Sequence, residues 1–253
     1  MKRAALFSII MVMFFSCTRK RTYELTDISH PVLDEWIAYY QSVNSDLSLD
    51  KFKKISGFIK YENSLFWYSP YVYKTNIYSP NRHYYIDLDV YANIEDDIYF
   101  ENELDGAYLI DVGNRRAAHI MGSDYSSFSI DDAFWINDSD FVILSYYIDF
   151  DDDYEYLGLN LEITIEDVKG NGLAYYVYND VIEPDELYII RRLRRQGIKY
   201  WDYNDLIHDV EVGETVYGIS RQYGISQEEL KYRNPELEHS VLQAGRKLVI
   251  PQR

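Results

Sequence analysis

Cysteine is almost missing from this chain, because Cys17 is the only one among 253 residues. With one cysteine the chain can form no internal disulfide and no zinc site built from several thiolates. Beyond Cys17 there is no thiol nucleophile either, which excludes cysteine-dependent hydrolases and transpeptidases. The folded part of the chain must therefore take its stability from a hydrophobic core.

Histidine is also sparse. The five histidines are scattered, with no HxH or HExxH spacing, at His30, His83, His119, His208 and His239. A zinc hydrolase needs two or three clustered histidines with a carboxylate, and the GxSxG motif that would support a serine hydrolase is missing too. We therefore predict no metal, no cofactor and no catalytic residue. One alternative stays open, because a glycan hydrolase needs only two carboxylates and residues 60–200 contain many.

Carboxylates alternate in one short stretch, at Asp149, Asp151 and Asp153, and Glu155 follows. Oxygen ligands at every second position can suit Ca²⁺. However, Tyr154 stands where a calcium loop of the EF-hand type needs glycine. We therefore predict a solvated acidic turn at this place.

Basic residues are few, since 25 lysines and arginines stand against 42 aspartates and glutamates, for a net charge of −17. Residues 22–204 hold 34 of these acids and only 14 of these bases. Such an acidic segment repels phosphates, so we predict no nucleic-acid partner. The acidity does not indicate disorder, because 27 tyrosines, 11 phenylalanines and 4 tryptophans can build a core.

Long apolar runs are missing as well. The run from Ala4 to Phe15 follows a basic start and is shorter than the about 20 residues that span a bilayer, so it suits the core of a signal peptide. It ends at Phe15-Ser16-Cys17, which resembles the lipobox of bacterial lipoproteins. The resemblance implies a signal peptide over residues 1–16, a lipid on Cys17 and a linker over residues 17–30. The alternative is an ordinary signal peptide that is cleaved near Ser16.

Residues 31–200 are predicted to form an acidic, tyrosine-rich domain made mainly of strands. Pro31–Ser42 has helical spacing with proline at its first position, and Leu49–Ile59 is predicted as a second helix. Tyr84–Val90 alternates in character and is predicted as a half-buried strand. Further strands are predicted at residues 107–112, 117–121, 134–136, 141–150, 157–168 and 173–178, a helix at Glu183–Gln196, and a bridge at Ile198–Asn204.

Two segments of this domain are alike, because Tyr78–Ile86 and Phe134–Ile143 each read as a turn that leads into a strand. They resemble the turns that open strands in the blades of a β-propeller. The chain has about two blades' length here, whereas a closed ring needs four or more. We therefore predict an open antiparallel meander packed against the N-terminal helix, and an α+β fold for the whole chain.

The last segment, residues 205–253, has the signals of a small β-α-α-β unit. A strand alternates up to Val212, and another covers Lys247–Ile250. The local signals for the ends of the two helices are an N-cap at Thr215, a C-cap at Gly224, a capping box of Ser226 with Glu229, and Pro235 after the second helix.

This order of elements closely resembles a LysM domain. The matching motifs are Val212–Val216 with Ile219, Tyr223–Ser226 with Leu230, Asn234–Pro235, and Leu242–Pro251. LysM domains bind glycans that contain N-acetylglucosamine, in bacteria chiefly peptidoglycan. The resemblance implies a groove between the loop after the first strand and the loop after the second helix. Its walls would be Gly213, Glu214, Thr215 and Val216 on one side, and Asn234, Pro235 and Leu237 on the other, with Leu237 little buried.

The predicted function follows from the two ends of the chain. We predict a lipid-anchored, non-enzymatic protein of the bacterial cell envelope that binds peptidoglycan or a chitin-like glycan. It would be a tether or scaffold on the outer membrane, facing the periplasm, or on the cell membrane, with an envelope protein as a possible partner of the acidic domain. One alternative is a cell-wall glycan hydrolase that uses a carboxylate pair in residues 60–200. The other is a structural component of an envelope complex whose LysM domain does not bind.

Overall fold

The computed structural model describes residues 23–55, 66–67, 75–88, 93–100, 105–123, 128–150, 156–182, 184–202 and 204–252. The predicted signal peptide, Cys17 and the acidic turn at residues 151–155 lie outside the described residues. The described part is a mixture of α-helices and mostly antiparallel strands, which confirms the predicted α+β class. No helix in these ranges is long and apolar enough to span a membrane.

The first helix, α1 (Pro31–Gln41), begins at the predicted proline. The ring nitrogen Nδ1 of His30 accepts a hydrogen bond from the Val32 N–H at 3.2 Å and so caps the helix. The second predicted helix is wrong over residues 49–55, where the chain forms a short 3₁₀ turn, η2 (Leu49–Lys51), and the strand β1 (Lys53–Lys54). The Ile55 N–H donates to the Tyr175 carbonyl at 3.0 Å, so pairing with a sheet edge overrides a weak helical preference.

The larger sheet has five antiparallel strands in the order β1-β12-β11-β10-β9. The bounds of its four longer strands are β9 (Phe128–Trp135), β10 (Asp140–Phe150), β11 (Tyr156–Asp167) and β12 (Gly172–Val181). These four follow one another in the chain and in the sheet, so they form the predicted antiparallel meander.

A second sheet has the order β2-β8-β7-β4-β3 and is a separate meander. Its strands are β2 (Phe66–Trp67), β3 (Ile77–Tyr78), β4 (Tyr84–Asp87), β7 (Asp105–Asp111) and β8 (Arg116–Ser123). The two similar turn segments lie beside each other, because the Asn81 N–H donates to the Asp138 carboxylate at 3.0 Å and the Trp135 Nε1–H donates to the Ile77 carbonyl at 2.8 Å.

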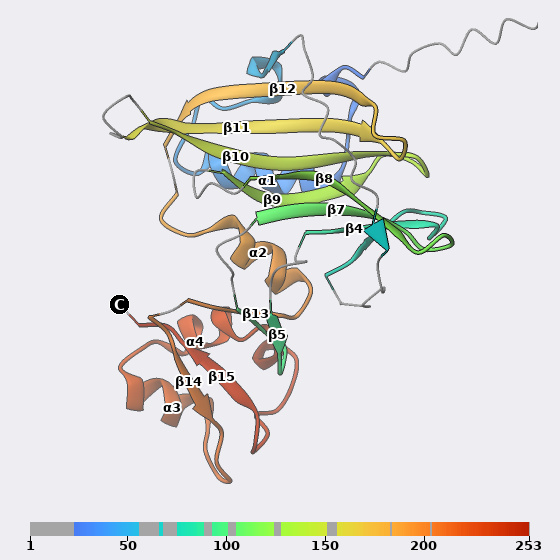
Figure 1. The fold of residues 1–253 in the computed structure, drawn as a ribbon. Helices are drawn as coiled ribbons and strands as arrows, with labels where there is room; N and C mark the ends of the chain where they lie inside the picture. The colour runs from blue at the N-terminus through green and yellow to red at the C-terminus, as the bar shows by residue number, and fades with distance from the viewer. Residues whose placement is uncertain are drawn as a thin grey trace, which may run out of the picture.

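The helix α1 and the two sheets form three layers, with α1 against one face of the larger sheet and the second sheet against the other (Figure 1). Alternate residues of β10 explain this order: Val142 and Leu144 pack with α1, while Phe141 and Ile143 pack with the second sheet. The strand β4 is buried on both faces rather than half buried as predicted. Ile86 faces the inter-sheet core, and Tyr85 packs on the outer face with other aromatic and apolar side chains.

A small group of elements lies between these three layers and the C-terminal unit (Figure 1). It consists of the helix α2 (Tyr188–Arg195) and a three-stranded sheet of β5 (Asn93–Glu95), β6 (Ile98–Phe100) and β13 (Lys199–Trp201), in which β13 and β6 are parallel. The helix is shorter than predicted. The Glu186 carbonyl accepts a hydrogen bond from the Tyr39 hydroxyl, so this residue is held by α1 instead of joining the first turn.

Candidate glycan-binding site

The C-terminal unit has the predicted β-α-α-β order. Its elements are β14 (Leu206–Asp209), α3 (Val216–Tyr223), α4 (Gln227–Arg233), the 3₁₀ turn η3 (Pro235–Glu238) and β15 (Lys247–Ile250). The strands β14 and β15 pair antiparallel. The Gly224 C-cap is left-handed with φ 70°, and Ser226 and Glu229 make both hydrogen bonds of the capping box, so these local predictions are confirmed.

The first predicted wall is the exposed loop between β14 and α3. Gly213 has φ 91°, a left-handed conformation that favours glycine. The Thr215 hydroxyl accepts the Gly218 N–H at 3.0 Å and caps α3. The other N–H groups of the first turn have no acceptor within the helix. Such groups at the start of a helix commonly donate hydrogen bonds to a bound ligand.

Glu214 in this loop is held by internal contacts. Its Oε2 accepts the Glu211 N–H at 2.7 Å and lies 2.8 Å from Nε2 of His208, whose Nδ1 is 3.0 Å from the Tyr223 hydroxyl. The Glu211 N–H and then the His208 ring lower the pKa of Glu214, so the carboxylate is charged at neutral pH. Glu214 therefore stabilises the conformation of the loop through contacts inside the C-terminal unit.

The second predicted wall begins at Asn234, whose side chain is fully buried. Its Nδ2 donates to the carbonyls of Leu230 at 2.7 Å and Val249 at 2.8 Å, and its Oδ1 accepts the Val249 N–H at 2.8 Å. The carboxamide thus ties the end of α4 to β15. Any contact between Asn234 and a sugar has to come from its backbone.

Leu237 is buried, contrary to the prediction that it lies open in the loop. It is 7% exposed and belongs to the core of the C-terminal unit, and Pro235 beside it is also buried. The reason is η3, which turns Leu237 back under the helices. The same core also contains Val216 as a partly buried member, so one apolar cluster holds the two predicted wall segments together.

The outer side of η3 faces the body of the protein. Lys199 of β13 is 3% exposed, lies 3.2 Å from the Glu236 carboxylate and donates to the Lys247 carbonyl at 2.6 Å. Arg194 of α2 pairs with Glu238 at the end of η3. The second predicted wall therefore lies between the core of the C-terminal unit and ion pairs from α2 and β13.

Two neighbouring buried carboxylates in the body, Asp131 and Asp132, bear on the alternative of a hydrolase. A β-bulge in β9 leaves Asp131 unpaired, since Leu144 is opposite Asp132 and Ser145 is opposite Ile130. A bulge re-aims side chains, and here Asp131 contacts α1 while Asp132 contacts α2.

Both aspartates are engaged inside the protein. Asp131 accepts the Trp36 Nε1–H at 2.7 Å and the Tyr40 hydroxyl at 2.8 Å, and Asp132 pairs with Arg195. Burial raises the pKa of Asp131 to about 7, although the hydrogen bonds from Trp36 and Tyr40 act against this. With exposures of 2% and 3%, the two carboxylates anchor the helices to the sheet. Within the described ranges, no group of three or more His, Cys, Asp and Glu side chains is placed to hold a metal ion.

The sequence prediction missed the polar contacts that join the C-terminal unit to the body. Four arginines stand close together at residues 191–195, in an otherwise acidic segment. This concentration of positive charge is the sequence signal for an interface.

Comparison with known protein families identifies the C-terminal unit. The model of the LysM domain family matches residues 208–251. A search of curated proteins and a search of solved structures each gave no match to the chain. LysM domains are modules that bind peptidoglycan or chitin-like glycans. The β-α-α-β order, the confirmed caps and the family match together show that residues 208–251 are a LysM domain.

Proposed function

We propose that this chain is a non-enzymatic tether or scaffold of the bacterial cell envelope, which binds peptidoglycan through its LysM domain and is held in a membrane by a lipid on Cys17. The observation that carries the proposal is the LysM match over residues 208–251, in which one apolar cluster contains Val216 and Leu237 of the two predicted walls. The membrane is the outer membrane, facing the periplasm, or the cell membrane.

The chemistry of the loops suits a glycan. Gly213 and Thr215 are exposed, and the start of α3 has N–H groups that can donate to an acetamido oxygen of N-acetylglucosamine. The side chains of Asn234, Pro235 and Leu237 are buried, so the second wall would offer its backbone. A polar backbone beside an apolar core is a common composition for a small-molecule site.

A tether also needs a firm connection between its parts. The ion pairs of Lys199 with Glu236 and of Arg194 with Glu238 connect the body to the LysM domain at η3. A polymer bound by the LysM domain would therefore hold the acidic body at a fixed place near the cell wall. The acidic body would then bind an envelope protein as its partner.

Co-sedimentation with insoluble peptidoglycan tests this proposal, with cellulose as the matched polymer that has no acetamido groups. We expect the full chain to sediment with peptidoglycan and to stay in solution with cellulose. The supernatant is then analysed for soluble muropeptides, and we expect none. A chain that stays in solution with both polymers would favour a LysM domain that does not bind, whereas released muropeptides would favour the hydrolase.

A further inference from the structure

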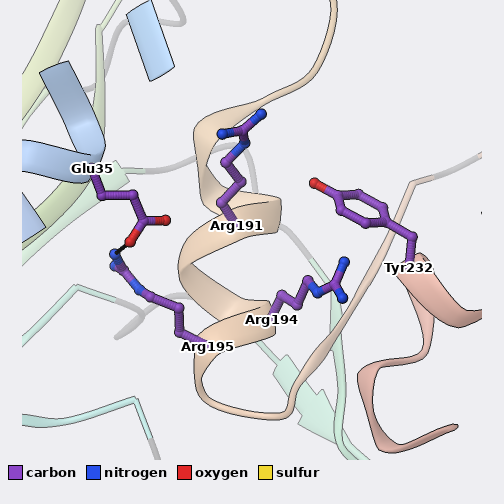
Figure 2. A pocket seen from close by; sticks show the side chains of 5 residues that line it. All are labelled: Glu35, Arg191, Arg194, Arg195 and Tyr232. Atoms are coloured by element: carbon purple, nitrogen blue, oxygen red, sulfur yellow. Dashed lines mark hydrogen bonds and ion pairs between the residues drawn. The ribbon is translucent and has the colours of Figure 1, made fainter. Parts of the chain in front are cut away.

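A cavity of about 440 Å³ lies between the body and the LysM domain. It is lined by Glu35 of α1, by Arg191, Arg194 and Arg195 of α2, and by Tyr232 of α4 (Figure 2). Its volume is in the range of small-molecule sites, about 300–1,000 Å³. Three guanidinium groups in one cavity are unexpected in a chain whose net charge is −17.

Two of the three arginines are fixed by carboxylates. Arg195 pairs with both Glu35 and Asp132, and Figure 2 shows Arg195 and Glu35 pointing toward each other. Arg194 pairs with Glu238 and its guanidinium lies 4.4 Å from the centre of the Tyr232 ring. These contacts place two cations on the cavity lining, and their charges are offset by Glu35, Asp132 and Glu238.

Arg191 is the most exposed of the three arginines and has unused hydrogen-bonding capacity. Its side chain is 41% exposed, and its Nε lies 3.5 Å from the Glu186 carboxylate, which also accepts the Tyr232 hydroxyl at 2.7 Å. The guanidinium lies 4.8 Å from the centre of the Tyr39 ring. A guanidinium has five N–H donors, and the contacts of Arg191 with described residues use only Nε among them. The terminal donors can therefore bind a carboxylate in the forked geometry typical of arginine.

The cavity is connected to the predicted glycan wall through the residues on either side of that wall in the chain. Tyr232 stands two residues before Asn234, and Glu238, the partner of Arg194, follows Leu237 directly. A glycan bound at residues 234–237 that extends past η3 would reach this cavity. Of the two glycan classes that LysM domains bind, peptidoglycan carries carboxylates on its peptides and chitin is uncharged.

We propose that the cavity around Arg191 binds a carboxylate of peptidoglycan and so selects this polymer over chitin. This inference rests on the proposed function, because the glycan has to be held by the LysM domain. The site would add one charge-assisted contact to the binding of the sugar. The competing interpretation is that the arginines only hold α2 to its neighbours. The following experiment distinguishes this interpretation from a carboxylate site.

The test compares two soluble ligands of equal sugar number by titration calorimetry with the full chain: a muropeptide oligomer with its peptides and a chitin oligomer. Arg191→Gln should weaken binding of the muropeptide about tenfold, the scale of one hydrogen bond to a charged group, and leave chitin binding unchanged. The control Lys169→Gln removes the same charge at an exposed turn and should change neither affinity. Arg191→Lys keeps the charge and should retain part of the muropeptide affinity.

Unchanged muropeptide affinity in Arg191→Gln, or an equal loss for both ligands, would overturn the carboxylate site while leaving the proposed function intact. Absence of binding to both ligands by the unaltered chain would overturn the proposed function and this inference with it. Raising the salt concentration should also reduce the ratio of muropeptide affinity to chitin affinity in the unaltered chain. The reason is that dissolved ions screen the attraction between Arg191 and the carboxylate.

Discussion

Asn234 and Val249 are joined by two hydrogen bonds of 2.8 Å, one from the Val249 N–H to the Asn234 Oδ1 and one from the Asn234 Nδ2 to the Val249 carbonyl. The same Nδ2 also donates to Leu230 of α4. One buried carboxamide thus joins the second helix of the LysM domain to its last strand. The sequence resemblance placed Asn234 on a glycan wall, and its side chain has this internal role.

Asn234→Ala should therefore destabilise the LysM domain. The substitution leaves the Val249 N–H and two carbonyls buried without partners, which costs about 3 kcal/mol. Thermal unfolding of the full chain, followed by the amide NMR signals of residues 206–252, would measure the loss. An unchanged stability together with lost glycan binding would show that Asn234 contacts the sugar directly.

Leu237→Glu should unfold the LysM domain and not merely block its groove. A carboxylate at this position enters the apolar core, at a cost of about 3 kcal/mol or more. Leu237→Met is the matched control, because it keeps the volume and should cost only about 1 kcal/mol. Normal NMR dispersion of the Glu variant would mean that the side chain can leave the core.

The stability of the body should depend on pH through Asp131. Its folded-state pKa of about 7 lies above the ordinary value of 3.8, so the folded protein holds this proton where the unfolded chain has lost it. The free energy of unfolding should then fall as pH rises from about 4 to about 7, by up to about 4 kcal/mol from this group.

Asp131→Asn separates this contribution from those of other acids. Asparagine does not titrate and keeps an acceptor for Trp36 and Tyr40. Urea unfolding at a series of pH values should show a smaller decrease between pH 4 and 7 in the variant. Parallel curves for the two proteins would contradict the raised pKa.

Cys17→Ala should abolish lipidation of the chain. The alanine has no thiol to carry a diacylglyceryl group, so metabolic labelling with palmitate should mark the unaltered chain and not the variant. Ser16→Gly keeps a small residue before the cysteine and should still be labelled. Equal labelling of the Ala variant and the unaltered chain would show that the lipid, if present, is elsewhere.

The LysM domain was predictable because its signals are local. Thr215, Gly224 and the pair Ser226–Glu229 determine where helices begin and end through contacts within a few residues. The strands of the larger sheet were likewise visible from their apolar periodicity, as β10 and β11 show. Such features depend on short stretches of chain, which the sequence displays directly.

Contacts between distant segments were not predictable in this way. The burial of Leu237 depends on η3, and the pairing of β1 with β12 depends on a partner more than a hundred residues away. The bulge at Asp131 has no local signal in the sequence. It brings two carboxylates to α1 and α2, and these helices are far from β9 along the chain. The cavity at Arg191 needs three elements from different parts of the chain, so only the folded structure reveals it.

The most direct test of the account is a calorimetric titration of an N-acetylglucosamine oligomer into Thr215→Asp and Ser226→Asp. Each variant adds one charge at an exposed N-cap, and aspartate caps as well as the residue it replaces, so both should stay folded. Thr215 belongs to the predicted wall and Ser226 does not. We predict that Thr215→Asp weakens binding tenfold or more, about 1.4 kcal/mol, while Ser226→Asp binds like the unaltered chain. Equal affinities for the two variants would contradict a glycan site at this loop.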